Sequence, residues 1–126
     1  MNASKLDTGK NGETLAAEFL KKNGYRVIEK NFKNYLGEID IIAKDKKVIC
    51  FVEVRTRTAP AETADILESV GSKKQYRLSR LALSFLKDKN LVDVRSRFDV
   101  VSVRLCEGKP EIELIKGAFE LNPKFS

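Results

Sequence analysis

Residues 37 to 58 read GEIDIIAKDKKVICFVEVRTRT, two runs of apolar and β-branched residues joined by a short polar segment. Such runs predict buried β-strands, and the joining segment around Asp45 is short enough for an antiparallel hairpin with a tight loop. Each run also contains a carboxylate, Asp40 in the first and Glu53 in the second. Burying an unpaired carboxylate is costly, so we expect a cationic partner, a raised pKa or a metal ion at this place.

The register of this hairpin decides whether the two acids meet. If the loop is centred between Lys46 and Lys47, paired residues have numbers that sum to 93, and Asp40 lies opposite Glu53. Any odd sum keeps both acids on one face of the sheet, whereas an even sum separates them. Directly opposed like charges repel each other. A cation between the two carboxylates would relieve that repulsion.

The rest of the chain extends this hairpin into an α/β pattern. Apolar residues at helical spacing predict one helix in residues 11–24, ending at Gly24, and a second beginning with Ser72 as its N-cap. Residues 25–32, 35–44 and 47–55 predict three strands, with a break at Lys33 and Asn34, and residues 96–119 predict two more around a CEGKP turn. Residues 56–71 lack periodicity and predict a mobile connection near the acids.

We therefore expect a single domain with a central mixed β-sheet flanked by helices. Its 126 residues fit the common domain size, with a core over about residues 9–117, a polar start and a polar tail. Positive charge exceeds negative charge, with 24 Lys and Arg against 18 Asp and Glu, a net +6. That excess favours a polyanionic partner, and nucleic acid is the leading candidate.

Several kinds of chemistry are excluded by composition. The chain has no histidine, which removes Ser-His-Asp and Cys-His catalysis and histidine metal sites. Cys50 and Cys106 lie in predicted strands without CxxC spacing and suit small buried residues in a reducing cytosol. No signal peptide or membrane span is apparent in the sequence, so we expect a cytoplasmic protein.

The order of the acids resembles a known nuclease arrangement. Glu13 in the first helix, Asp40 on the second strand and the triplet Glu53-Val54-Arg55 on the third resemble the PD-(D/E)XK nuclease superfamily. More specifically, the segments GETLAAEFLKKNGYRVIEKNF (12–32), GEIDIIAKD (37–45), FVEVRTR (51–57) and RFDVVSV (97–103) resemble the YraN family of small bacterial endonuclease-like proteins. The resemblance covers roughly residues 9–105.

This resemblance implies a restriction-endonuclease-like core, similar to small Holliday-junction resolvases, that hydrolyses DNA phosphodiesters. The implied cofactor is Mg²⁺, with Mn²⁺ as a substitute, and its implied ligands are Glu13, Asp40 and Glu53. Helical geometry points Glu13 toward the sheet and Glu18 toward solvent. Glu38, within the GEID signature, is expected to form a salt bridge or to support the ligands. A homodimer is expected by analogy with resolvases.

One position departs from the superfamily pattern. Arg55 stands where the superfamily has lysine, and because arginine stays protonated it can serve only electrostatically. Arginine at this place is a familiar variation in YraN-like sequences. The missing group could come from the start of the second helix, at Lys73, Lys74 or Gln75. The residues expected to contact nucleic acid are basic: Arg57, Lys73, Lys74, Arg77 and Arg80.

Each functional interpretation has a structural alternative. Glu13 could be a first-turn acid that favours the helix dipole. Asp40 and Glu53 could form structural ion pairs with Arg55, Arg57 or Lys74, and the basic helix could be a solvated surface. We interpret Asp99, with Arg97 two residues away, as a structural ion pair outside the metal site.

Two rival functions follow from these alternatives. The first is a nucleic-acid-binding domain of the same fold that has lost cleavage, which Arg55 favours. The second is a protein-interaction domain whose acids form structural ion pairs.

Overall fold

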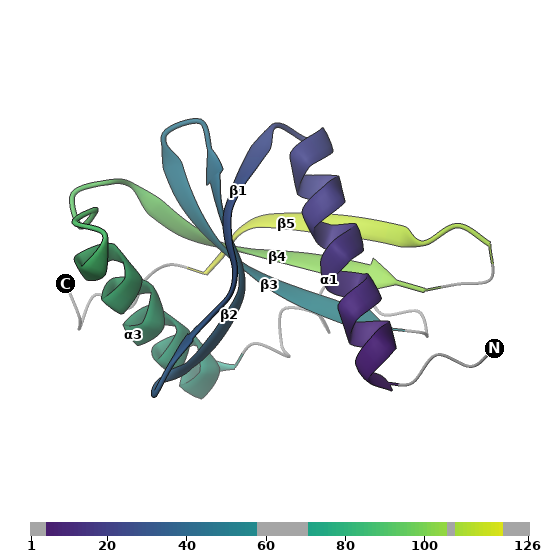
Figure 1. The fold of residues 1–126 in the computed structure, drawn as a ribbon, viewed down its shortest axis with the longest axis horizontal. Coiled ribbons are helices and arrows are strands. Elements are labelled where there is room, and N and C mark those ends of the chain that lie inside the picture. Colours follow the sequence, from purple (N-terminus) through teal and green to yellow (C-terminus); the bar gives the residue numbers. More distant parts are fainter. Residues whose placement is uncertain (1–4, 58–70, 106–107, 120–126) are drawn as a thin grey trace.

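The computed structural model describes residues 5–57, 71–105 and 108–119 (Figure 1). Its elements follow the predicted order and are α1 (Lys5–Lys22), β1 (Tyr25–Asn34), β2 (Gly37–Asp45), β3 (Val48–Arg57), α3 (Ser72–Asp88), β4 (Ser96–Arg104) and β5 (Glu111–Phe119). Across the described residues, one five-stranded sheet has the order β1-β2-β3-β4-β5. The β3–β4 pair is parallel and the other pairs are antiparallel, which confirms the predicted mixed sheet and α/β class.

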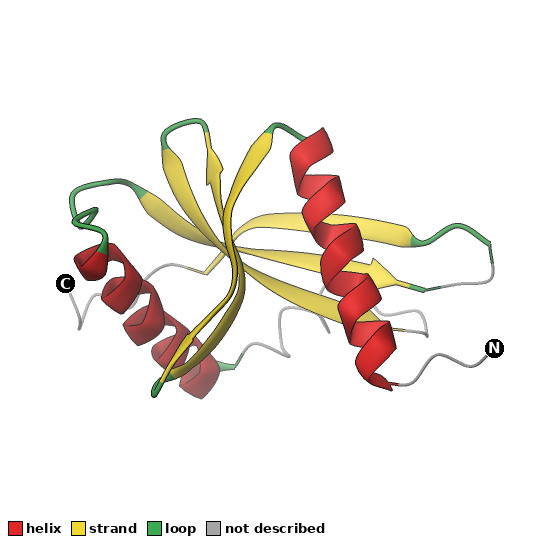
Figure 2. Ribbon diagram, in the orientation of Figure 1, coloured by secondary structure: helices red, strands yellow, loops and turns green. Residues whose placement is uncertain are grey.

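Each helix covers one face of the sheet. Along β3, Ile49 and Phe51 pack in the cluster beneath α3, whereas Cys50 and Val52 pack in the cluster beneath α1. The two clusters alternate because successive strand residues point to opposite faces. The first half of β3 is therefore apolar on both faces, as expected for a strand that is covered on both sides. Figure 2 shows the twisted sheet lying between the two helices.

The first helix is longer than the apolar pattern predicted. It begins at Lys5 rather than near Asn11, because the first six residues, KLDTGK, contain a single apolar residue and so show no helical apolar period. Its end is as predicted, with Gly24 just beyond it at a φ of 88°, a conformation that glycine adopts readily. The longer helix places Glu13 more than two turns from its start. The first-turn dipole explanation for Glu13 is therefore wrong.

The β2–β3 hairpin has the predicted register. Ile41 pairs with Val52 and Asp45 with Val48, so the paired numbers sum to 93, and Lys46 in the turn has a φ of 57°. The preceding β1–β2 turn was placed two residues too early. Asn34 still pairs with Gly37, and the turn consists of Tyr35 and Leu36.

The second predicted helix is α3, and all its predicted apolar positions are buried: Leu78, Leu81, Ala82, Phe85 and Leu86. Its predicted N-cap is wrong, since Ser72 is the first helical residue and Gly71 occupies the cap position without a side-chain hydrogen bond. Most of the predicted connection, residues 58–70, and Cys106 lie outside the described residues. In the described part of the chain, no helix is long and apolar enough to cross a membrane.

Candidate metal centre

Asp40 lies where β2 separates from β3. The last backbone pair between these strands is Ile41 with Val52, one residue before Asp40 and Glu53 would pair. Ile39 packs in the α3 cluster and Ile41 in the α1 cluster, although residues two apart in a regular strand share a face. The strand therefore twists at Asp40. Its Oδ2 atom accepts a hydrogen bond from the backbone N–H of Val54 at 2.8 Å, which ties the carboxylate to β3.

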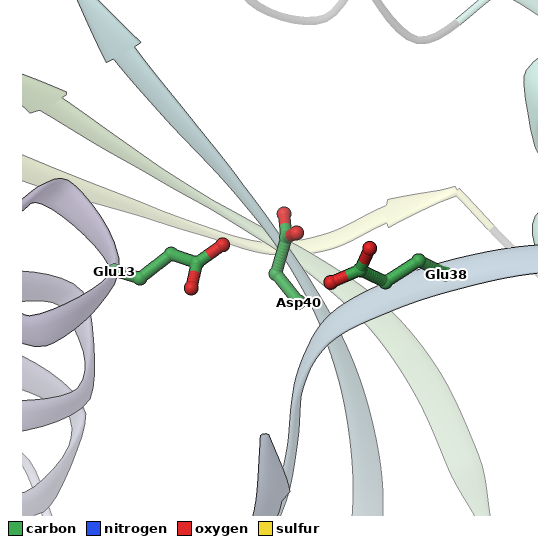
Figure 3. Close-up of side chains that lie close together, drawn as sticks. All are labelled: Glu13, Glu38 and Asp40. Atoms are coloured by element: carbon green, nitrogen blue, oxygen red, sulfur yellow. The ribbon is translucent and has the colours of Figure 1, made fainter. Parts of the chain in front are cut away.

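Three carboxylates converge at this separation. Glu13 extends from α1, and Glu38 and Asp40 extend from β2, with one oxygen of each lying within 4.8 Å of the others. Figure 3 shows the Glu13 and Glu38 side chains directed toward Asp40 from opposite sides. Glu13 is half-buried and Glu18 is exposed, as helical geometry predicted. Carboxylate oxygens are hard ligands of the kind that Mg²⁺, Mn²⁺ and Ca²⁺ accept. This group could therefore hold a divalent cation.

Asn31 contacts two of these acids, and it was not identified as a site residue from the sequence. Its side-chain amide nitrogen donates to Glu38 Oε1 at 2.8 Å and lies 3.2 Å from Glu13 Oε2. Asn31 sits within β1 at a φ of 53°, a left-handed conformation that asparagine tolerates better than most residues. An asparagine inside the strand pattern YRVIEKNF was the available signal, because asparagine is depleted in strands.

Glu53 lies beside Asp40 but pairs with a different group. Burial and, second, the Glu53 carboxylate raise the pKa of Asp40 to about 8. Glu53 itself forms an ion pair with Lys74 of α3, with Nζ 3.4 Å from Oε2. Two of the expected remedies for buried acids are thus present in one site, a raised pKa at Asp40 and a cationic partner at Glu53. The third acid that converges with Glu13 and Asp40 is Glu38, for which we predicted a salt bridge or a supporting role.

The other predicted site residues lie on the α3 side of this centre. Arg55 and Arg57 are half-buried and follow Glu53 at alternate positions of β3, so they share its face. Gln75 is half-buried in the first turn of α3. Lys74 turns toward Glu53, while the remaining predicted nucleic-acid contacts on this helix are exposed: Lys73, Arg77 and Arg80.

The predicted Asp99–Arg97 ion pair is confirmed as a separate structural cluster. Asp99 is fully buried, and its Oδ1 accepts from Arg97 Nε and from the backbone N–H of Gly117, each at 2.9 Å. Its Oδ2 accepts from the hydroxyl of Tyr25 at 3.0 Å. Burial and the adjacent Asp99 carboxylate raise the pKa of Tyr25, so its hydroxyl stays protonated and can donate. Every oxygen of this buried acid has a partner.

Gly12 allows α1 to approach the sheet next to the candidate centre. A Cβ atom at this position would overlap Oγ1 of Thr56 and lie 3.0 Å from its Cβ, closer than such atoms normally approach. Thr56 is on β3, so the contact fixes the distance between helix and sheet one residue before Glu13. A side chain at position 12 would push Glu13 away from Asp40.

We therefore expect Gly12→Ala to weaken divalent-metal binding about tenfold, the range for losing a group that orients a ligand. Titration of Mn²⁺ by calorimetry measures this, with Thr14→Ala on the exposed side of the same helix as control. Combining Gly12→Ala with Thr56→Ala, which removes the overlapping Oγ1, should recover part of the affinity. If position 12 had free space around it, replacing glycine with alanine would stabilise the helix, because alanine has the higher helix propensity. A more stable variant with unchanged metal affinity would contradict the packing role.

Comparison with protein families identifies the chain. The model of "Uncharacterised protein family UPF0102" matches residues 12–103. The chain belongs to this family. It is the YraN family that the sequence motifs predicted, and the matched region contains Glu13, Glu38, Asp40 and Glu53.

Relatives in the family match along nearly their full length. A UPF0102 protein of Syntrophus aciditrophicus is 49% identical over 92% of this chain and 91% of its own. One from Geobacter metallireducens is 41% identical over 96% and 98%, and one from Moorella thermoacetica 42% over 94% and 100%. Among solved structures, Pyrococcus furiosus SfsA in complex with Ca²⁺ covers 86% of this chain and 62% of its own at 12% identity, with a TM-score of 0.36. That likeness is too weak to support an inference.

Proposed function

We propose that this protein is a metal-dependent endonuclease that hydrolyses DNA phosphodiester bonds. The observation that carries the proposal is the convergence of Glu13, Glu38 and Asp40 where β2 leaves β3. Burial first, and then the neighbouring Glu53 carboxylate, raise the pKa of Asp40 in this group to about 8. A site of this kind gains free energy when a divalent cation displaces the proton.

The donor set fits Mg²⁺ or Mn²⁺, since it consists of oxygen atoms. Glu13, Glu38 and Asp40 would hold the ion, which would supply activation of water and stabilisation of the charge on the phosphate. Glu53 is the fourth acid in this proposal. It lies beside Asp40 and pairs with Lys74, and it would be available as a further ligand if Lys74 turned to a substrate phosphate.

The remaining groups position the phosphate and the attacking water. Lys74 can donate to a phosphate oxygen or orient water, because it is a flexible ammonium beside the acids. Gln75, next to it in α3, can orient water by hydrogen bonding. Arg55 stabilises negative charge and does not accept a proton. Arg57 and the exposed Lys73, Arg77 and Arg80 supply phosphate contacts along the approach to the site.

The proposed activity also implies a cellular location and a use for the positive charge. A DNA substrate places the protein in the bacterial cytoplasm, and the net charge of +6 suits binding to its backbone. A homodimer remains a prediction from the analogy with resolvases. Arg55 supports one rival function, a DNA-binding domain that no longer cleaves, because the position lacks a group that can lose its proton.

Cleavage and melting assays test the proposal together. We expect the protein to cut labelled branched, flapped or nicked DNA with Mg²⁺ or Mn²⁺ and to be inactive in EDTA. Binding of metal at about 100 times its Kd should stabilise the fold by about 2.7 kcal/mol, a rise of several degrees in melting temperature. Metal stabilisation and DNA binding without cleavage would favour the inactive rival. Absence of any metal response would rule out the metal centre.

A further inference from the structure

A groove runs along the outer side of α3, bordered by the turn between β1 and β2. Its first part is a hollow of about 560 Å³ lined by two tyrosines and three cations: Tyr35, Tyr76, Lys73, Arg77 and Arg80. A second hollow of about 420 Å³ shares Tyr35, Leu36 and Arg80 with the first and is lined at its far end by Lys87 and Asp88. We call the two hollows together the α3 groove.

The cations of the α3 groove form one stripe on the helix. Lys73, Arg77, Arg80 and Lys87 are separated by 4, 3 and 7 residues, so they lie on one side of α3, opposite the buried Leu78 and Phe85. At 1.5 Å per residue the stripe extends about 21 Å. The first turn of α3 contains no acid. A stripe of this length matches several consecutive phosphates of one nucleic-acid strand.

Two exposed tyrosine rings lie beside these cations in the first hollow. Tyr35, in the β1–β2 turn, is 90% exposed, and Tyr76 is 44% exposed. Leaving two large rings in contact with water within one hollow forgoes the free energy of burying them. Cations that follow a backbone together with aromatic rings on which bases stack are the combination used by proteins that bind single strands. A duplex cannot use such rings, because its base faces are already stacked.

The α3 groove adjoins the candidate metal centre through two contacts. A Cβ atom on Gly37 would lie 3.3 Å from Arg77 Cδ and from Leu81 Cδ1, so α3 packs closely on the residue before Glu38. Lys74, next to Lys73 of the groove, pairs with Glu53 of the site. The end of the groove at Lys73 and Arg77 therefore adjoins Gly37 and Lys74, which lie next to or contact the acids of the candidate site.

We propose that the α3 groove binds unpaired nucleotides, so that the substrate is DNA with a single-stranded segment beside the cleaved bond. The assignment of the substrate class rests on the proposed nuclease function, whereas binding of a single strand does not. Tyr35 and Tyr76 stack on the bases, and Lys73, Arg77 and Arg80 contact the phosphates. A uniform duplex can use only the phosphate contacts.

Fluorescence anisotropy in EDTA tests the binding, since cleavage is then absent. The probes are a single strand of about 12 nucleotides, the matching blunt duplex, and that duplex with an unpaired tail. The wild type should bind the single strand and the tailed duplex more tightly than the blunt duplex. Tyr35→Ala should weaken binding of the first two about tenfold, the loss expected for one stacked base, and change duplex binding less than about twofold.

Three further variants separate stacking from other causes. Tyr35→Trp should restore binding, because tryptophan also stacks. Ile28→Ala removes another exposed apolar side chain, on β1 outside the groove, and should leave all three affinities unchanged. Arg80→Ala should weaken single-strand and duplex binding alike and lower their dependence on salt.

Different outcomes separate this proposal from the proposed function. Equal loss of single-strand and duplex binding in Tyr35→Ala, no loss of either, or a wild type that prefers the blunt duplex would overturn the groove assignment even if the enzyme cleaves DNA. The expected binding pattern without cleavage in Mg²⁺ or Mn²⁺ would support the groove and reject the nuclease. Binding of an acidic protein with no affinity for any probe would also overturn it.

Discussion

Replacing Asp40 with asparagine is expected to reduce DNA cleavage about a thousandfold or more while leaving the protein folded. The substitution removes a carboxylate from the group that would hold the ion, and metal-ion catalysis contributes several kcal/mol at about 1.4 kcal/mol per tenfold in rate. Affinity for DNA in EDTA should be equal or higher, because a negative charge near the phosphate has been removed. Asp93→Asn, the same change at an exposed position in the loop before β4, serves as control.

Stability should change in the opposite direction from activity. In EDTA the asparagine variant should melt at or above the wild type, because its amide is neutral at every pH, whereas folding forces the Asp40 carboxyl either to keep a proton or, above its raised pKa, to be ionised beside Glu53. Its stabilisation by Mn²⁺ should largely vanish. A wild type that ignores metal, with a variant that melts lower, would show instead that the acids are structural ion pairs. Unchanged cleavage by the variant would end the nuclease assignment.

The same comparison has a predictable dependence on pH. The pKa of Asp40 is raised from 3.8 to about 8 in the folded protein by burial and then by Glu53, so the folded state keeps a proton that the unfolded state loses. The contribution of Asp40 to stability therefore falls as pH rises from about 4 to about 8. The melting temperature of Asp40→Asn relative to wild type should rise across this interval in EDTA and level off above it. A difference that is flat with pH would contradict the raised pKa.

The sequence predicted the hairpin, its register and the closeness of Asp40 to Glu53, because these depend on local features, although the backbone pairing ends one residue before the two acids. Strand alternation and a turn centred at Lys46 and Lys47 determine the register, and the backbone pairs follow it. The same alternation could not predict the twist at Asp40. That twist arises where β2 separates from β3 to pack against a different cluster, which depends on the whole fold.

The residues that make up the candidate site were harder to predict from the sequence, because their contacts also depend on the whole fold. Glu38 joins the acids because Asn31, in a left-handed conformation inside β1, donates to it and lies close to Glu13. Strand alternation assumes a regular backbone throughout β1, so it cannot predict the contacts that Asn31 makes in its left-handed conformation. The close approach of α1 likewise depends on Gly12 meeting Thr56, two residues far apart in the sequence. The residues of α1 before Asn11, KLDTGK, are mostly polar and show no apolar periodicity, so the sequence did not predict that the helix begins at Lys5.

The largest loss of stability is expected from Arg97→Ala, in the cluster around Asp99. Arg97 is the only cation that donates to Asp99 among the hydrogen bonds of the described residues, and Asp99 is fully buried. Tyr25 and Gly117 still donate to the carboxylate in the variant, but they do not compensate its charge. Removing one partner of a buried ion pair destabilises proteins by about 3–5 kcal/mol. For a domain of this size we expect the melting temperature to fall by more than about 10 °C.

A matched control lies on the same strand. Arg104→Ala removes an arginine of β4 whose ion-pair partner, Glu111, is largely exposed, and such surface pairs contribute about 0–1 kcal/mol. Chemical denaturation of both variants measures the difference. Because the loss in Arg97→Ala comes from a stranded charge, adding Asp99→Asn should recover part of it, since an amide needs no counter-ion. If the double variant is no more stable than Arg97→Ala, the loss reflects the packing of the arginine side chain and the neighbouring Asp45 contact rather than the buried charge.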